Sequence, residues 1–315
     1  MPAAEMRIHD NQVVQTASIG AISVRNDVLF TNEKGQGKPS VQKRSEKALQ
    51  RLMPALQSVL LPDETVLYIA RANSPLTLLE RLTAAWWTRL LAASAIVVTN
   101  KRLLFFPVKR DGSWRESVRA VYWGDLEEAK ARGLLVQIIT FKSKNGTKIT
   151  YTNFRRGDAK KMAAIAAALL PAASGEMTAA HGFVQLCPSC RSVLTQGQYF
   201  CSGCSLVFKN EKAMVTRSIF LPGGGYFYTG HPLIAMIPAV VEGIFMVNIL
   251  LLLLAGVASP RVRSNLLPTL AVLVLFWAFE TAVTILHCRR YIREYIPEKR
   301  GALRGRQDVM AKVGG

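Results

Sequence analysis

The sequence has few acidic residues and few histidines, and it lacks the residue sets of common catalytic centres. Asp and Glu number 21 against 40 Lys and Arg, the formal net charge is +19, and there are 4 histidines. We find no Ser-His-Asp set, no glycine-rich nucleotide loop and no carboxylate pair outside the apolar segments. We therefore expect a protein that is not an enzyme. Its positive charge suits anionic lipid headgroups or nucleic acid.

The first 30 residues lack the basic start, apolar run and small-residue cleavage site of a secretory signal peptide. We expect the N-terminal part to stay in the cytosol, where cysteines remain reduced. Four of the five cysteines form two Cys-x-x-Cys knuckles, namely Cys187, Cys190, Cys201 and Cys204. Two knuckles can complete a closed tetrahedral shell of four thiolates, so their spacing predicts a structural zinc site without a catalytic water. Disulfides are the weaker interpretation.

The knuckles Cys-Pro-Ser-Cys and Cys-Ser-Gly-Cys, with short apolar strands beside them, resemble a minimal zinc ribbon over residues 183–210. Arg191 and Ser205 stand directly after the knuckles, where that family has glycine. The resemblance implies a module that binds protein or nucleic acid or acts as a spacer. Because no dense basic stripe with interleaved aromatic residues accompanies it, we do not expect nucleic-acid binding. We interpret Cys288 and the adjacent His287 as packing residues.

The N-terminal 180 residues predict an α+β domain. Residues 1–40 show little periodicity and end in a polar stretch, so we expect a mobile segment. Residues 41–60 predict a basic amphipathic helix that Pro54 bends or divides. Apolar runs at 66–70, 95–98, 102–108, 118–123, 134–142 and 147–154 predict antiparallel strands, and 157–170 predict a closing helix. Residues 172–182 form a linker.

A further helix is expected over residues 75–91, where Trp86 lies on an apolar face and Trp87 widens that face. We expect this face to pack on the sheet. The alternative is that its tryptophans lie at the headgroup level of a bilayer.

The run from Ile96 to Phe106, with Thr99-Asn100-Lys101-Arg102 as a turn between two strands, resembles the bacterial pleckstrin-homology and GRAM-like domains. The resemblance covers residues 61–171 and implies an antiparallel sheet or barrel closed by a C-terminal helix. Fold analogy alone assigns no ligand. Basic residues follow near the last hairpin and the closing helix, and we interpret them as an anionic-headgroup face, with an ordinary solvated surface as the alternative. They are Lys142, Lys144, Lys148, Arg155, Arg156, Lys160 and Lys161.

Residues 211–292 predict a membrane region with spans near 232–257 and 266–286, each long enough to cross about 30 Å of hydrocarbon. More Lys and Arg flank the outer ends of the pair than its short connection. The positive-inside rule therefore places both termini in the cytoplasm, with residues 293–315 as a basic cytoplasmic tail, and the chain in the inner membrane. The stretch before the first span, ending in Phe227-Tyr228-Thr229-Gly230, resembles the entry segment of a family of short two-span membrane domains.

Glu242 and Glu280 are carboxylates inside the predicted spans, where ionised groups are costly. Similar depths permit the two side chains to meet, directly or through Asn248, Thr281 or Thr284. We prefer interhelical hydrogen bonding between protonated acids, and a proton or cation path through an oligomer is the alternative.

The sequence as a whole predicts a membrane-anchored adaptor that presents a pleckstrin-like domain and a structural zinc ribbon to the cytosol. Its partners are the bilayer, a protein and, in one version, an anionic lipid, and a homo-oligomer stays open. The competing function is a small oligomeric proton or cation channel built on Glu242 and Glu280.

Overall fold

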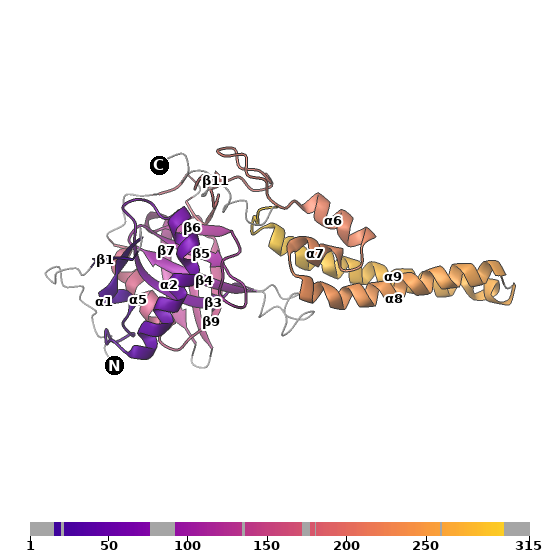
Figure 1. Ribbon diagram of the computed structural model, residues 1–315, viewed down its shortest axis with the longest axis horizontal. Helices are drawn as coiled ribbons and strands as arrows, with labels where there is room; N and C mark the ends of the chain where they lie inside the picture. The colour runs from indigo at the N-terminus through magenta and orange to yellow at the C-terminus, as the bar shows by residue number, and fades with distance from the viewer. Residues whose placement is uncertain are drawn as a thin grey trace. The chain divides into compact units, whose positions relative to one another are not determined.

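A computed structural model describes residues 16–19, 22–75, 92–133, 136–171, 177–179, 181–258 and 260–298. The chain divides into two compact units, the first including Met1–Leu206 and the second Val207–Lys299 (Figure 1). The helix expected over residues 75–91, with Trp86 and Trp87, lies outside the described residues.

The first unit is α+β, as predicted, and is built on a curled antiparallel half-barrel. Its main strand order is β11-β10-β6-β5-β4-β3-β9-β8-β7. The strands are β3 (Thr65–Asn73), β4 (Ala93–Thr99), β5 (Arg102–Pro107), β6 (Val118–Tyr122), β7 (Leu126–Arg132), β8 (Gln137–Ser143), β9 (Lys148–Phe154), β10 (Val184–Leu186) and β11 (Val193–Leu194), with a short 3-10 helix η1 (Trp123–Asp125) between β6 and β7.

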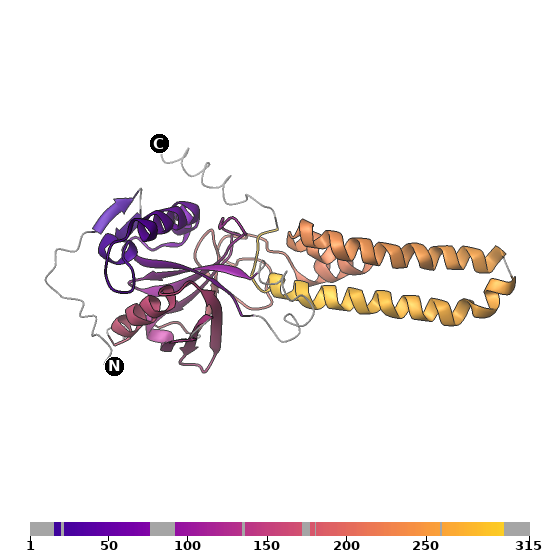
Figure 2. The same ribbon diagram turned by 90° about the horizontal axis from the view of Figure 1, so that it is seen from below.

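The central strands of the half-barrel are buried on both faces, and helices provide part of this cover. Every residue of β4 is buried, and such a strand needs cover on both sides. Helix α2 (Pro39–Val59) lies across one side of the sheet, and helix α5 (Asp158–Leu169) contacts β3, β7 and β8 (Figures 1 and 2). Pro54 does not divide α2. Its ring is exposed, so the helix carbonyl that it leaves unbonded can face water.

The N-terminal region is more structured than the sequence predicts. In place of a mobile segment, residues 22–40 form β2 (Ile22–Arg25), the short helix α1 (Asn26–Leu29), a turn closed by a bridge between Thr31 and Gly37, and the start of α2. Strand β1 (Thr16–Ile19) pairs with β2, which adds to β3 in parallel. Ile22, Val24 and Leu29 are buried in the core, and the stretch is too short for its apolar residues to show a period.

Strand β7 was not predicted. Its sequence, Leu-Glu-Glu-Ala-Lys-Ala-Arg, is rich in charged helix-forming residues. In the sheet order it is an end strand, where charged side chains are common because they discourage pairing with other chains.

The turn between β4 and β5 ends at Arg102, which forms a deeply buried ion pair with Glu64. Arg102 is 1% exposed and donates to Glu64 through Nε at 3.0 Å and Nη2 at 2.8 Å. Its guanidinium also donates to the carbonyl of Val59, at 3.0 Å, and to the hydroxyl of Tyr122, at 3.2 Å. Thr99 donates to Glu64 at 2.7 Å and accepts from the backbone of Lys101 and Arg102. The Thr-x-Lys-Arg turn therefore joins the end of α2 to β3, β5 and β6.

The second unit is helical, with α6 (Glu211–Phe220), α7 (Gly224–Thr229), α8 (Pro232–Ala258) and α9 (Pro260–Ile292). Helices α8 and α9 run side by side in both views (Figures 1 and 2). Candidate spans are Pro232–Val257 and Asn265–Ile292, and 11% of the most apolar window of each is buried. Two long apolar helices with exposed side chains agree with the predicted spans, and the second continues past residue 286.

Residues 293–298 differ from the predicted tail. Tyr295 and Ile296 are buried, Lys209 N donates to Ile296 O at 3.0 Å, and Glu298 N donates to Val207 O at 3.0 Å. Phe208 forms a bridge with Pro297 in the same unit, so the ribbon expected up to residue 210 ends near Leu206.

Replacing Arg102 with Met should lower the free energy of unfolding by about 3–5 kcal/mol, because it leaves Glu64 buried without its charge partner. Lys101 on the same turn pairs with Asp63, which is 68% exposed, so Lys101→Met should cost less than about 1 kcal/mol. Denaturant unfolding of the detergent-solubilised chain, followed by tryptophan fluorescence, measures both changes. Equal losses in the two variants would contradict this account of the turn.

The glycines before α8 can be tested in the same way. A Cβ on Gly224 would overlap the carbonyl oxygen of Arg217, whereas a Cβ on Gly243 in α8 meets nothing within 4 Å. We expect Gly224→Ala to destabilise the helical unit by about 1–3 kcal/mol through overpacking, and Gly243→Ala to cause no loss. Thermal unfolding in detergent, read by resistance to trypsin, provides the comparison. An unchanged Gly224→Ala variant would show that α6 and α7 do not need this close approach.

Candidate metal centre and basic pocket

The four knuckle cysteines lie together in the first unit, as their spacing predicts. Their sulfur atoms all fall within 4.8 Å of one another, with 3.5 Å between Cys187 and Cys204 and 3.4 Å between Cys190 and Cys201. Four thiolates bonded to a tetrahedral ion at about 2.3 Å lie about 3.8 Å apart. The cluster therefore has the donor set and the size of a metal site.

The two knuckles share one backbone pattern. Cys187 N donates to Ser192 O and Arg191 N to Cys187 O, while Cys201 N donates to Leu206 O and Ser205 N to Cys201 O. Arg191 and Ser205 have φ of 67° and 58°, the left-handed conformation that glycine adopts most easily. Such strain persists where the surroundings over-determine the backbone. Arginine in place of glycine at position 191 adds one contact, because the Arg191 guanidinium donates to Leu60 O at 3.1 Å.

The thiols are tuned in opposite directions. Burial acts to raise the pKa of Cys190, but the side-chain and backbone hydrogen bonds of Ser192 outweigh it and lower this pKa to about 6. Burial raises the pKa of Cys187. A metal ion binds cysteine as the thiolate, so all four side chains would be deprotonated in an occupied site.

The knuckles are attached to the half-barrel. Strand β10 pairs with β6, with Val184 opposite Ala120 and Leu186 opposite Val118. Val184 and Leu186 belong to the hydrophobic core of the first unit. The sequence predicts only short apolar strands beside the knuckles, and the structure shows that one of them extends the sheet into the first knuckle.

The predicted anionic-headgroup face is split by the structure. Lys142, Lys144 and Lys148 lie around the β8–β9 turn, whereas the other four residues follow the far end of β9. Seven residues of strand at about 3.3 Å each separate the two groups by roughly 20 Å. Lys142 forms an ion pair with Glu127. The seven basic residues therefore do not form one cluster.

Lys161 is a buried structural residue. Its side chain is 3% exposed, and its amine donates to the carbonyls of Val28 and Thr31 and to the Thr31 hydroxyl. Burial lowers its pKa to about 8. Lys161 thus holds the N-terminal segment against α5.

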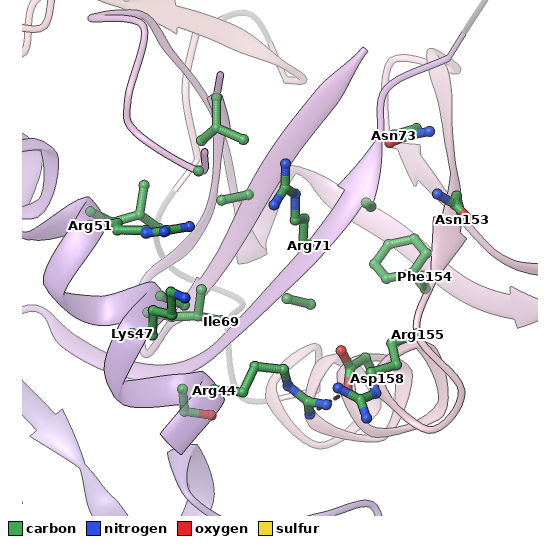
Figure 3. A pocket seen from close by; sticks show the side chains of 18 residues that line it. Arg44, Lys47, Arg51, Ile69, Arg71, Asn73, Asn153, Phe154, Arg155 and Asp158 are labelled. Atoms are coloured by element: carbon green, nitrogen blue, oxygen red, sulfur yellow. Dashed lines mark hydrogen bonds and ion pairs between the residues drawn. The ribbon is translucent and has the colours of Figure 1, made fainter. Parts of the chain in front are cut away.

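A second basic group lines a cavity of about 500 Å³ in the first unit (Figure 3). Helix α2 contributes Arg44, Lys47 and Arg51, which share one face because they lie three and seven residues apart. Arg71 extends from β3, and Arg155 from the segment between β9 and α5. We refer to this cavity as the basic pocket. The sequence predicted the basic side of the helix and included Arg155 in the anionic-headgroup face, but only the packing of α2 beside β3 brings these residues together.

The basic pocket contains one carboxylate, Asp158, at its end near Arg44 (Figure 3). Arg44 donates to Asp158 at 3.2 Å and the Tyr68 hydroxyl donates to the same oxygen at 2.9 Å. Burial raises the pKa of Asp158, and Arg44 and Tyr68 oppose this rise. Arg71 donates to the carbonyls of Lys109 and Arg110. Within the described residues, Lys47, Arg51 and Arg155 have no ion-pair partner.

The two carboxylates of the predicted spans have different surroundings. Glu242 is 1% exposed and accepts from Gly223 N at 2.7 Å and from the Thr284 hydroxyl at 3.4 Å. Glu280 is half-buried, and within the described residues no hydrogen bond joins it to Glu242. Asn248 is exposed and donates to Ile244 O of its own helix. Gly223 is a partner that the sequence did not predict.

Two of the three aromatic residues in the entry segment before α8 are buried. Tyr226 and Tyr228 are buried, and Phe227 is 50% exposed. The Tyr226 hydroxyl and His287 Nδ1 are 2.7 Å apart, and His287 and Cys288 are both buried, as expected for packing residues.

Comparison with known families supports the predicted domain. Residues 60–167 match the model of the family described as Bacterial PH domain. No curated protein and no solved structure matches the chain significantly. The match covers β3 to most of α5, so α2, the knuckles and the helical unit lie outside it. A GRAM-like relationship stays a prediction.

Relief of the backbone strain in the second knuckle should strengthen metal binding. Ser205→Gly removes a left-handed serine, which costs about 1 kcal/mol or more, so the dissociation constant for zinc as the probe ion should fall about fivefold. Ser202, an exposed serine of the same knuckle without a positive φ, is the matched control and should bring no gain on replacement by Gly. Competition with a chromophoric chelator measures both. Weaker binding by Ser205→Gly would contradict this interpretation.

Proposed function

We propose that this chain is a membrane-anchored adaptor that is not an enzyme, with a PH-like domain that binds a protein or an anionic lipid. The observation that carries the proposal is the presence, in one chain, of a match to the bacterial PH domain family and two long apolar helices with exposed side chains. PH domains serve as binding modules, and helices of this length and composition anchor proteins in bilayers.

The metal that suits the four cysteines best is zinc in a structural role. An all-thiolate tetrahedral shell leaves no position for a substrate, so the ion would stabilise the knuckles and take no part in a reaction. Cys187, Cys190, Cys201 and Cys204 would hold it. Since β10 leads directly into the first knuckle, the ion would also fix this edge of the sheet.

The proposed topology has both termini in the cytoplasm of a bacterial cell, with the chain in the inner membrane. The support is the excess of Lys and Arg at the outer ends of α8 and α9 over their connection. A proton or cation channel has less support, because Glu242 is engaged by a backbone amide and a hydroxyl in the same unit. A homo-oligomer remains compatible with either function.

Membrane extraction and metal analysis of the full-length chain test the proposal together. The chain should stay in the membrane fraction after an alkaline carbonate wash, enter solution with detergent and carry one zinc ion per chain. Cys201→Ser should abolish zinc binding and leave membrane attachment intact, whereas Cys288→Ser, the matched control, should retain both.

Adaptor function is tested by crosslinking in intact cells, followed by capture of the full chain and of a variant that lacks residues 60–167. A partner, protein or lipid, should depend on that domain. Release of the chain by carbonate alone, or capture of identical material by both forms, would overturn the proposal.

A further inference from the structure

We propose that the basic pocket binds a ligand that carries a phosphate group next to an apolar part. This proposal deepens the proposed function by naming the ligand class, and it rests on that function for the lipid version of the ligand. It concerns a cavity whose α2 side lies outside the region that matches the bacterial PH domain family.

The charge balance of the basic pocket is the first argument. Five basic side chains and one carboxylate line about 500 Å³, and Asp158 is already engaged by Arg44 and Tyr68. Two further acids lie nearby: Asp111 interacts with Arg51 but is exposed and bonded to Ser113, and Glu33 lies beside Gly157. Like charges gathered around a cavity repel one another unless an anion neutralises them. The pocket therefore favours a ligand with more than one negative charge.

The donor types indicate phosphate. Arg51 and Arg155 offer planar guanidinium groups without an ion-pair partner in the described residues, and such groups bind two oxygens of one phosphate at once. Lys47 adds a flexible point charge. Asn73 and Asn153 carry amides at the same cavity (Figure 3), and Asn153 has φ of 60°, a conformation that asparagine adopts more readily than most residues.

The floor of the basic pocket indicates the apolar part. It is made of aliphatic and aromatic side chains, namely Ala48, Leu52, Ile69, Ala72, Val108 and Phe154. Ligand sites of this size combine apolar walls with a few polar groups that fix orientation. An inorganic anion alone would leave these walls uncovered, whereas an amphiphilic phosphate covers them.

The two sources of such a ligand are the headgroup region of an anionic lipid and a free phosphorylated metabolite. The lysines of the β8–β9 turn are the comparison surface, because Lys144 and Lys148 are exposed on a hairpin and do not line the cavity. Both surfaces attract anions at long range, but only the basic pocket combines its charges with a cavity and apolar walls.

The test uses the full chain in nanodiscs of phosphatidylcholine, with pyrophosphate as the soluble probe. Binding is read by calorimetry and by protection of Lys47 from acetylation, quantified by mass spectrometry. The double variant Arg51→Gln/Arg155→Gln should bind pyrophosphate at least about tenfold more weakly, because it removes both guanidinium forks. The matched controls Lys144→Gln/Lys148→Gln and Arg156→Gln/Lys160→Gln remove the same charge from exposed positions that do not line the cavity, and they should change affinity less than about twofold.

A second arm distinguishes the sources. If the ligand is a lipid headgroup, nanodiscs with one-fifth phosphatidic acid should protect Lys47 without pyrophosphate and reduce pyrophosphate affinity. If it is a free metabolite, pyrophosphate should protect Lys47 equally in both nanodiscs. Absence of protection by either probe, or equal losses in pocket and control variants, overturns the proposal. Because membrane attachment and partner capture are measured separately, such a failure would leave the adaptor function standing.

Discussion

The buried pair of Arg102 and Glu64 is the interaction on which the arrangement of the first unit depends. A guanidinium that is 1% exposed must have each of its donors satisfied, and here the acceptors come from Glu64, Val59 and Tyr122. Val59 is the last residue of α2, so the charge fixes the end of that helix relative to the sheet. The same contact helps to keep the α2 wall of the basic pocket beside β3, together with the burial of Leu49, Leu52 and Leu56 in the core.

The candidate metal centre is attached to the same sheet at the edge formed by β6. Strand β6 would present unpaired backbone groups at its free edge, and β10 covers it. Cys187 follows β10 directly, and Arg191 of the first knuckle reaches Leu60 just after α2. The first knuckle and helix α2 are thus both held at the C-terminal end of α2, near Val59 and Leu60.

Local patterns predicted the elements of this protein well, and non-local packing accounts for most of the rest. The spacing of the knuckles predicted the cluster of four cysteines, and the Thr-x-Lys-Arg turn predicted the pairing of β4 with β5. Strand β7 was not predicted because an edge strand needs few apolar residues. Strand β2 was not predicted because the strand that joins it to the main sheet, β3, is distant in sequence, with Thr65 opposite Ser23. The basic pocket could not be predicted, because it depends on the packing of α2 beside β3, and this tertiary contact leaves no local sequence pattern. Lys161 was misassigned for the same reason, since its acceptors come from Val28 and Thr31.

In the helical unit, Glu242 and the glycines before α8 form one structural feature. Gly223 begins α7 in the left-handed conformation, and its amide is an N-terminal helix donor that needs an acceptor in apolar surroundings. A side chain at this position would collide with Ala235 O, so only glycine brings the amide within 2.7 Å of the Glu242 carboxylate. The carboxylate in turn gains a second donor from Thr284 of α9. A carboxylate costs free energy in hydrocarbon, but Glu242 of α8 joins α7 and α9 through its hydrogen bonds. This structural role accounts for its presence without ion transport.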